Sequence, residues 1–292
     1  MSDSDPLRLD GTDPAAAVRS DTLSRLDDCR RAGVDPLLAT VLVSDDPADR
    51  RFMDRKHEAC AEVGIDTRRV DLPPDVDAER VYRAVSDLGA DPAVTALFVQ
   101  VPLPEHVDEA AVRRRVPPGK DVDCFAPANL GRLVGGDPRV RPVTSRAVDR
   151  LLTAYDIEVA GRDAVVVGRT TAIGKPLAHL CCRRDATVTV CHSRTRDLAA
   201  RTRTADLLIT AAGTPDLVDG SMVSEGVVVV DVSVSRVDTD DGTDLVGDVD
   251  AASVRPKAAA LTPVPGGVGP LTMAMVLDNV VAVSEPDADQ SR

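Results

Sequence analysis

Aromatic side chains are scarce in this sequence. Phe and Tyr together make up 2% of the 292 residues, and Trp is absent. Proteins that bind single-stranded nucleic acid stack its bases on aromatic side chains, so the composition argues against that partner. Duplex nucleic acid is disfavoured as well, because 35 basic residues face 48 acidic ones and the formal net charge is −13.

Long hydrophobic runs are also missing. The apolar run 227–230 is far too short to cross a bilayer. The first residues, MSDSDPLRLD, contain neither the basic segment nor the apolar segment of a secretory signal. None of the six cysteines forms a CxxC pair, so no metal site is expected. We therefore expect a cytoplasmic protein with reduced thiols, no metal and no membrane partner.

Lysine is rare, with 4 residues against 31 arginines, and 40 of the 48 acidic residues are Asp. An acidic, Asp-rich and Lys-poor surface retains water at high ionic strength, which indicates a halophile-like protein. A genome rich in G and C would produce the same bias, and composition does not separate the two explanations. Under either explanation, a lysine that is retained in this sequence is a stronger candidate for a functional role than a lysine in an average protein.

Strand and helix patterns alternate along the whole chain, and the length corresponds to about two domains. This alternation predicts an α/β fold with mostly parallel sheets. A stretch rich in Pro and Gly, 116–136, is expected to be a long functional loop. The predicted strands are 37–43, 68–72, 96–101, 164–167, 187–191, 207–210 and 227–232, and the predicted helices are 14–32, 47–63, 78–88, 145–155, 174–184, 198–205 and 271–283.

The strand 164–167 leads directly into the sequence GRTTAIG and then into a helix. Glycines at both ends of such a turn let the backbone approach a pyrophosphate, which the N–H groups and the dipole of the helix stabilise. Because the spacing is not GxGxxG, a plain turn between strand and helix remains an equal alternative. The residues expected to contact a dinucleotide here are Gly168, Arg169, Thr170, Ile173 and Gly174.

The end of the next strand indicates which dinucleotide would bind. An NAD site has an acidic residue there for the ribose 2′-hydroxyl. This sequence has Cys191-His192-Ser193-Arg194 instead, without a carboxylate. A hydroxyl and a guanidinium suit a 2′-phosphate, so Ser193 and Arg194 favour NADP over NAD. Arg194 could equally be a solvated charge at the start of a helix.

Four further segments carry a resemblance that covers residues 9–283. These segments are KHEACAEVG, VQVPLP, KDVDCFAPANLGRL and TPVPGGVGPLT. Together with GRTTAIGKP, in this order and spacing, the sequence resembles the bifunctional methylenetetrahydrofolate dehydrogenase/methenyltetrahydrofolate cyclohydrolase (FolD) family. The resemblance implies a homodimer that binds tetrahydrofolate derivatives and NADP. It implies an N-terminal folate-binding catalytic domain, 1–143, a Rossmann-like NADP-binding domain, 144–284, and a cleft between them.

The resemblance also implies roles for single residues. Lys56 would be the catalytic lysine, Gln100 its hydrogen-bonding partner, and Asp123 the carboxylate that holds the pterin amino edge. In this family the last helix, about 271–283, packs back on the first domain, and the tail 285–292 is expected to be disordered. Further implied folate contacts are Phe52, Val99, Pro102, Leu103, Asp123, Pro265, Gly266 and Gly267, and further implied cofactor contacts are Ala212, Gly213 and Val234.

The sequence departs from the family pattern at several of these places. Phe52 stands where the family has Tyr, so stacking on folate is retained but the hydroxyl is lost. Cys124 and Ser233 stand where the family has Gly, and Ser233 is expected to crowd the nicotinamide end. Three alternatives remain open: a bifunctional enzyme, a dehydrogenase with little cyclohydrolase activity because of Phe52, and a paralogue that binds folate or NADP without catalysis.

Overall fold

A computed structural model describes residues 5–239 and 242–285. The chain divides into two compact units, each assembled from two segments. Unit 1 contains Met1–Ala16 and Thr144–Thr272, and unit 2 contains Ala17–Val143 and Met273–Arg292. Of the tail expected to be disordered, 285–292, only Glu285 lies within the described residues, and its side chain pairs with Arg25. Among the described residues, no helix is long and apolar enough to span a membrane.

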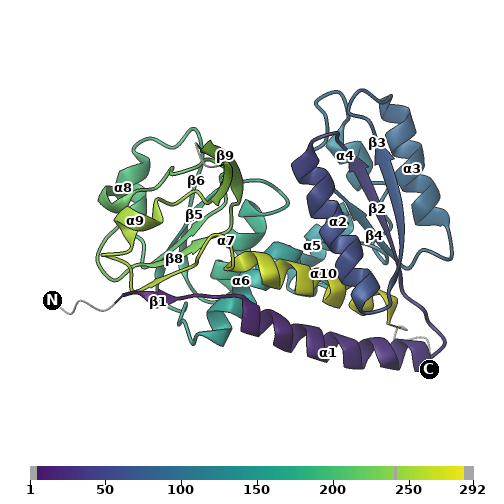
Figure 1. The fold of residues 1–292 in the computed structure, drawn as a ribbon, viewed down its shortest axis with the longest axis horizontal. Helices are drawn as coiled ribbons and strands as arrows, with labels where there is room; N and C mark the ends of the chain where they lie inside the picture. The colour runs from purple at the N-terminus through teal and green to yellow at the C-terminus, as the bar shows by residue number, and fades with distance from the viewer. Residues whose placement is uncertain (1–4, 240–241, 286–292) are drawn as a thin grey trace. The chain divides into compact units, whose positions relative to one another are not determined.

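Unit 2 contains a three-stranded parallel sheet in the order β3-β2-β4. The central strand has the sequence LLATVLV, and six of its seven residues are buried, as expected for a strand covered on both faces. Helix α3 adds a buried stripe to the same core. The elements are β2 (Leu37–Val43), α2 (Pro47–Glu62), β3 (Asp66–Leu72), α3 (Ala78–Ala90), β4 (Ala96–Val99), α4 (Glu109–Arg113) and α5 (Pro127–Gly135), with most of α1 (Thr12–Arg31) and of α10 (Val268–Ser284) (Figure 1).

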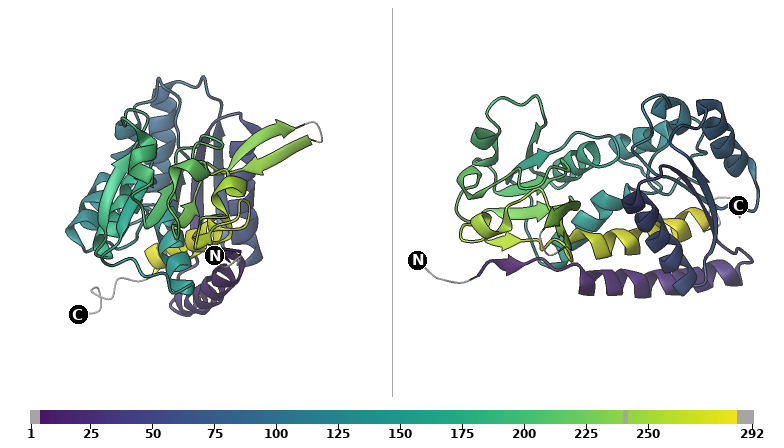
Figure 2. Two further views of the ribbon diagram at one scale, coloured as in Figure 1. Left: turned by 90° about the vertical axis from the view of Figure 1, so that its left-hand side faces the viewer. Right: turned by 45° about the horizontal axis from the view of Figure 1, so that its top comes forward.

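Unit 1 contains a six-stranded parallel sheet in the order β1-β11-β8-β7-β5-β6. Its elements are β1 (Leu7–Arg8), α6 (Val143–Ala154), β5 (Asp163–Val167), α7 (Gly174–Arg183), β6 (Thr187–Cys191), α8 (Leu198–Thr202), β7 (Leu207–Thr210), η1 (Gly220–Met222), β8 (Val228–Asp231), β9 (Ser235–Thr239), β10 (Gly242–Val246), α9 (Ala251–Val254) and β11 (Ala260–Leu261). Strands β9 and β10 form a separate antiparallel hairpin, which projects away from the six-stranded sheet (Figure 2).

The order of these strands defines where a ligand can bind in unit 1. Strand β5 lies between β6, the next strand along the chain, and β7, the one after that. From β5 the chain moves outward to its neighbour β6, and it then crosses back past β5 to β7 on the other side. The direction of the strand order therefore reverses at β5. In an open α/β sheet, such a reversal opens a crevice at the carboxyl ends of the strands. The loops that follow Val167 and Thr210 border this position.

The structure confirms the α/β class and corrects the sequence prediction in one segment. The expected loop 116–136 contains helix α5, which begins at Pro127 and ends before Gly136 in the left-handed conformation. Proline at the first helical position and glycine just after the last one are helix boundaries rather than loop signals. The prediction also missed the short elements β1, α4, η1, α9 and β11 and the hairpin β9–β10.

Candidate active site

Helix α2 positions two of the predicted site residues. Asp46 caps its first turn by accepting a hydrogen bond from the backbone N–H of Ala48 at 2.7 Å. Phe52 and Lys56 are four residues apart, so their side chains lie on the same face of the helix. Lys56 is only 1% exposed, whereas Phe52 is 36% exposed. The helix thus buries its lysine beneath an aromatic ring that remains accessible.

The ammonium group of Lys56 is enclosed by aromatic rings. Its Nζ lies 3.3 Å from the centre of the Phe52 ring and 4.6 Å from that of Phe98. Among the described residues it has no hydrogen-bond partner. Burial lowers the pKa of Lys56 to about 7, against the opposing attraction of Asp123 and Asp49. A lysine in this environment can both accept and donate a proton near neutral pH.

Asp123 is the second group in unit 2 that titrates near neutral pH. Its Oδ1 accepts a hydrogen bond from the backbone N–H of Val143 at 2.8 Å. Burial raises the pKa of Asp123 to about 7, and the charge of Asp121 adds to the rise while Lys56 and the Val143 N–H oppose it. Lys56 and Asp123 are therefore two groups of unit 2 whose pKa values lie near neutral pH and whose charges attract each other.

Asp121, two residues earlier, has a different environment. Its carboxylate accepts hydrogen bonds from the backbone N–H groups of Asp123, Phe125 and Ala126 and from the side chain of Asn129, at 2.8 to 3.1 Å. Such a carboxylate organises the loop and has little capacity left for a ligand. The structure thereby distinguishes the two carboxylates of the KDVD motif.

Gln100 follows strand β4 and is held by two hydrogen bonds. Its backbone N–H donates to the carbonyl of Val41 at 2.9 Å, and its Nε2 donates to the carbonyl of Val101 at 2.8 Å. The side-chain oxygen Oε1 is left buried without a partner among the described residues. The amide therefore offers an acceptor. Of the other predicted contacts on this segment, Val99 is buried, Leu103 is half-buried and Pro102 is exposed.

The departure at Cys124 has a conformational consequence. Its backbone has φ of 55°, in the left-handed region that favours glycine, and its side chain is nevertheless buried. Burial raises the pKa of the Cys124 thiol to about 12, so the group stays protonated. A glycine at this position would satisfy the backbone more easily but would leave the volume of the thiol unfilled.

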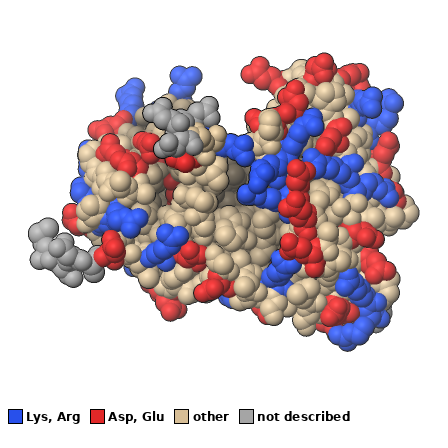
Figure 3. Space-filling view, in the orientation of Figure 1, with Lys and Arg blue, Asp and Glu red and all other residues tan. Residues whose placement is uncertain are grey.

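The surface beside Phe52 is locally basic. Arg50, Arg51 and Arg55 are exposed on helix α2, and none of them forms an ion pair with a described residue. Figure 3 shows Lys and Arg side chains gathered over this helix. In a chain with a net charge of −13, such a surface favours the approach of an anionic ligand.

In unit 1, the loop between β5 and α7 is packed too tightly for larger residues. A Cβ atom on Gly168 would lie 2.5 Å from the carbonyl oxygen of Ala211, and one on Gly174 would lie 2.4 Å from the Gly168 carbonyl group. Thr170 closes the loop by accepting hydrogen bonds from the N–H groups of Ile173 and Gly174 at 3.2 and 3.3 Å. The glycines thus allow the loop to turn close to the sheet, and this geometry fits a dinucleotide cradle.

The predicted 2′-phosphate residues lie on exposed turns. Ser193 and Arg194 belong to a turn in which the N–H of Thr195 donates to the carbonyl of His192 at 2.7 Å. Ser193, Arg194 and Arg169 are exposed, and neither arginine forms an ion pair with a described carboxylate. Both guanidinium groups are therefore available to a phosphate.

The loop after β7 contains the predicted cofactor contacts Ala212 and Gly213. Both are exposed, but their backbone N–H groups are already engaged: Ala212 donates to Asp248 at 2.6 Å and Gly213 donates to Ser233 at 3.2 Å. A Cβ atom on Gly213 would meet nothing within 4 Å. This loop can contact a cofactor through its outer surface. Val234, also predicted, is 55% exposed.

The glycines of the TPVPGGVGP segment form a tight turn against the N-terminal segment of unit 1. The N–H of Gly11 donates to the carbonyl of Gly266 at 2.9 Å, and that of Gly267 donates to the carbonyl of Pro263 at the same distance. A Cβ atom on Gly11 would lie 1.9 Å from the oxygen of Gly267. Pro265 is exposed beside them. The turn therefore has a fixed shape that other residues could not adopt.

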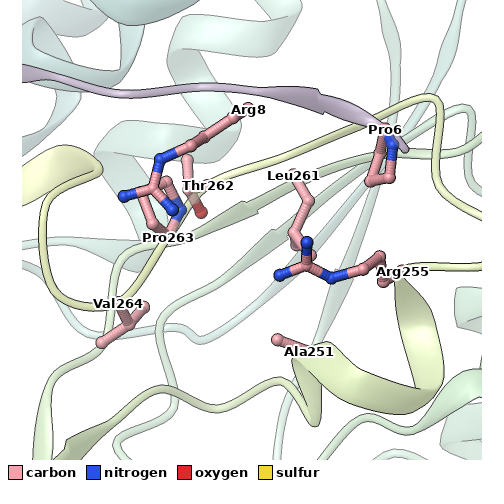
Figure 4. A pocket seen from close by; sticks show the side chains of 8 residues that line it. All are labelled: Pro6, Arg8, Ala251, Arg255, Leu261, Thr262, Pro263 and Val264. Carbon is pink, nitrogen blue, oxygen red and sulfur yellow. The ribbon is translucent and has the colours of Figure 1, made fainter. Parts of the chain in front are cut away.

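A pocket of about 190 Å³ lies beside the start of this segment. Figure 4 shows that the guanidinium groups of Arg8 and Arg255 line it, together with Thr262 and Pro263. Neither arginine was predicted as a site residue. Both are also close to carboxylates, Arg8 to Asp10 at 3.4 Å and Arg255 to Asp5 at 3.9 Å.

Sequence reasoning missed three residues that shape these sites. Phe98 is the second ring beside Lys56, and Asp231 and Asp248 are buried carboxylates at the carboxyl edge of the unit 1 sheet. Asp231 ends the valine run VVVVD, and this pattern was a usable signal for that residue. Among the described residues there is no group of three His, Cys, Asp or Glu side chains arranged to hold a metal ion.

Comparison with known proteins places both units in one family. Residues 9–123 match the tetrahydrofolate dehydrogenase/cyclohydrolase catalytic domain, and residues 142–288 match the NAD(P)-binding domain of the same family. The bifunctional protein FolD of Haloquadratum walsbyi is 49% identical over 97% of this chain and 92% of its own. The bifunctional protein FolD of Salinibacter ruber is 48% identical over 95% of each chain.

Solved structures of enzymes with the same name have a similar fold. The bifunctional enzyme FolD, a methylenetetrahydrofolate dehydrogenase/cyclohydrolase, from Campylobacter jejuni superposes with a TM-score of 0.87 at 38% identity, over 94% of this chain and 97% of its own. The Trypanosoma brucei enzyme of the same name was solved with NADP and an inhibitor. It superposes with a TM-score of 0.89 at 36% identity, over 96% of this chain and 97% of its own. With matched domains along most of its length and relatives close to half identical, the chain belongs to the tetrahydrofolate dehydrogenase/cyclohydrolase family.

Proposed function

We propose that this protein oxidises methylenetetrahydrofolate to methenyltetrahydrofolate with NADP and then hydrolyses the product to formyltetrahydrofolate. The observation that carries the proposal is the buried Lys56, whose pKa of about 7 and unpaired Nζ suit a proton-transferring group. Family membership supplies the substrate class.

The residues of unit 1 fit NADP. When bound, NADP supplies a nicotinamide ring that accepts a hydride from the methylene carbon of the substrate. The tight loop from Gly168 to Gly174 would receive the pyrophosphate, and Arg169, Ser193 and Arg194 would bind the 2′-phosphate. Ala212, Gly213 and Val234 would contact the cofactor through their exposed surfaces.

The residues of unit 2 would bind and orient the folate. The carboxylate of Asp123 would accept the N–H groups of the pterin, and the ring of Phe52 would stack on it. Gln100 would hold Lys56 through its Oε1, although this oxygen and the Lys56 Nζ are not hydrogen-bonded to each other in this structure. The remaining contacts that we propose are Val99, Pro102 and Leu103 of unit 2, and Pro265, Gly266 and Gly267 of unit 1.

In the hydrolytic step, neutral Lys56 would accept a proton from water as the water oxygen adds to the methenyl carbon. The bond from this carbon to N5 then breaks, and N5 gains the proton held by Lys56. The second proton of the water is released to solvent as the formyl carbonyl forms. A lysine with a pKa near 7 matches both halves of this cycle, since it must be neutral first and charged afterwards.

One observation favours a second candidate function. Phe52 has no hydroxyl, and its ring lies directly over the ammonium of Lys56. If hydrolysis needs a phenol to pass the proton on, the protein would be a dehydrogenase with little cyclohydrolase activity. A paralogue that binds without catalysis has no need of a buried lysine, which makes that alternative the least supported.

We also propose that the protein acts in the cytoplasm as a homodimer and that its acidic, lysine-poor surface suits a solvent of high salt concentration. The family resemblance supports the dimer, and the composition supports the solvent. We further propose the functional division 1–143 for folate and catalysis and 144–284 for NADP, with the last helix serving the first domain. Sedimentation at several salt concentrations tests the dimer.

A single assay separates the three functions. Purified protein is mixed with methylenetetrahydrofolate and NADP in high salt, and reduced nicotinamide and methenyl absorbance are followed together. Reduced cofactor without lasting methenyl signal supports the bifunctional enzyme, and accumulating methenyl signal supports the dehydrogenase alone. Absence of reduced cofactor contradicts both. Lys56→Ala should abolish hydrolysis, whereas the control Lys257→Ala, which removes a lysine of unit 1 outside the proposed sites, should not.

A further inference from the structure

Ser233 connects the ends of two strands in the unit 1 sheet. It follows β8, and its Oγ donates a hydrogen bond to Oδ2 of Asp248 at 2.7 Å. The same Oγ accepts a hydrogen bond from the backbone N–H of Gly213, in the loop after β7, at 3.2 Å. The Ser233 hydroxyl is thus a hydrogen-bond donor to Asp248 and an acceptor from Gly213. The side chain is therefore turned toward these partners, and the crowding of the nicotinamide end stays a prediction.

The carboxylate of Asp248 completes the connection. This side chain is fully buried and accepts hydrogen bonds from the N–H of Ala212 at 2.6 Å and of Thr214 at 2.7 Å. Together with Ser233 it therefore engages three consecutive N–H groups, those of residues 212, 213 and 214. The middle one depends on Ser233 alone, because Asp248 binds the N–H groups on either side of it.

The Ser233 backbone is fixed as well. Its N–H donates to Oδ1 of Asp231 at 3.0 Å, and the other oxygen of Asp231 accepts from the N–H of Val249 at 2.9 Å. Asp231 is 3% exposed. Ser233 therefore has little freedom to turn away from the loop that it holds.

The loop held in this way lies against the phosphate loop. The N–H of Ala211 donates to the carbonyl of Val167 at 2.8 Å, and the Ala211 carbonyl occupies the space where a Cβ of Gly168 would be. A shift of residues 211–214 would therefore move the wall against which Gly168 packs. Both loops border the crevice at the carboxyl ends of β5 and β7.

We infer that Ser233 is a positioning residue for the cofactor: its hydroxyl locks residues 212–214 inward, so that their outer surface and the phosphate loop keep the shape that receives NADP. The inference rests on the proposed function for the identity of the cofactor. Ser233 does not need to touch the cofactor, because it acts through the backbone of Gly213. Removing its hydroxyl leaves the Gly213 N–H without its partner, and Oδ2 of Asp248 keeps only the hydrogen bond from the Ala212 N–H.

The test uses the full-length protein and three variants. Ser233→Ala removes the hydroxyl, Ser233→Thr retains it, and Ser235→Ala is the matched control, because the Ser235 hydroxyl makes no hydrogen bond to a described residue. Two quantities are measured: amide hydrogen exchange of the segment 211–216 without any cofactor, and the Kd for NADP by calorimetry. The KM values for NADP and for the folate substrate follow as a third comparison.

We expect Ser233→Ala to exchange faster in this segment and to bind NADP roughly tenfold more weakly, with the KM for folate changed by less than about twofold. Ser233→Thr should restore both properties, and Ser235→Ala should match the wild type. Unchanged exchange or an unchanged Kd for NADP in Ser233→Ala overturns the inference, and so does an equal rise of both KM values. Wild-type protein that fails to bind NADP contradicts the proposed function and the inference together. Normal NADP binding by the wild type with an unchanged Ser233→Ala contradicts the inference alone.

Discussion

The Nζ of Lys56 lies 3.3 Å from the centre of the Phe52 ring, closer than to any other described ring. A ring face attracts a cation, so Phe52 stabilises the charged form of this lysine while burial destabilises it. The two residues are therefore coupled, and a change in the ring alters the proton affinity of the amine.

This coupling predicts a shift in pH dependence. If neutral Lys56 accepts the proton of water, hydrolysis of methenyltetrahydrofolate should become faster as the pH rises through about 7. Phe52→Leu removes the ring and lowers the pKa of Lys56 further, so the midpoint should move to lower pH. Phe98→Leu, which removes the ring at 4.6 Å, should give a smaller shift in the same direction. A midpoint that moves to higher pH in Phe52→Leu would show that the ring does not stabilise the cation.

Lys56 should also make the stability of the protein depend on pH. Its pKa is about 7 in the folded protein and 10.5 in the unfolded chain, so the unfolded state binds more protons between these values. The free energy of unfolding should therefore rise with pH across this window, and the cost of burying the charge is fully present below about 7. We expect Lys56→Met to stabilise the protein by on the order of 3 kcal/mol at pH 6 and by much less at pH 10.5. Urea unfolding at both pH values checks this, and equal gains at the two would exclude Lys56 as the source.

The two carboxylates of the KDVD motif should respond differently to the same substitution. Asp121→Asn loses an acceptor that holds three backbone N–H groups and Asn129, and we expect it to destabilise the protein by about 2 to 4 kcal/mol. Asp123→Asn retains an oxygen for the Val143 N–H and should leave the fold intact, but it should weaken folate binding roughly 100-fold. Thermal unfolding and folate titration of both variants provide the comparison. Destabilisation by Asp123→Asn with unchanged folate binding would reverse the two assignments.

Cofactor preference should depend on the exposed loop after β5 and the exposed turn after β6. The double variant Arg169→Ala/Ser193→Ala removes two groups assigned to the 2′-phosphate, so the Kd for NADP should rise roughly 30-fold or more while that for NAD changes by less than about twofold. Arg196→Ala, an exposed arginine close by in the sequence, is the matched control and should change neither. Equal losses for NADP and NAD would show that these residues do not recognise the phosphate.

Strands made of continuous apolar residues could be predicted from the sequence almost to the residue. The run 37–43 is β2 and 207–210 is β7, because buried parallel strands carry a strong local signal. Helix α5 was missed, since its Pro and Gly were interpreted as loop residues. Two-residue strands such as β1 carry no local pattern, and only their pairing defines them.

The candidate site could be predicted less well than the strands from local patterns in the sequence. The segment RRFMDRKHE suggests an exposed, charged helix face, yet Lys56 is buried, because three charged neighbours project outward while the lysine faces inward. Family resemblance alone pointed to it. The network of Ser233, Asp248 and the loop after β7 joins three distant parts of the chain, and no spacing along the sequence predicts such a meeting.

The pairing of β1 with β11 has a consequence for the way the protein is made. On the ribosome, Leu7 and Arg8 are made more than 250 residues before their partners Ala260 and Leu261. Chain growth is slow compared with the formation of local structure. Strand β1 must therefore remain without its partner while all of the intervening chain is made, and this edge of the six-stranded sheet can close only after Leu261 has emerged.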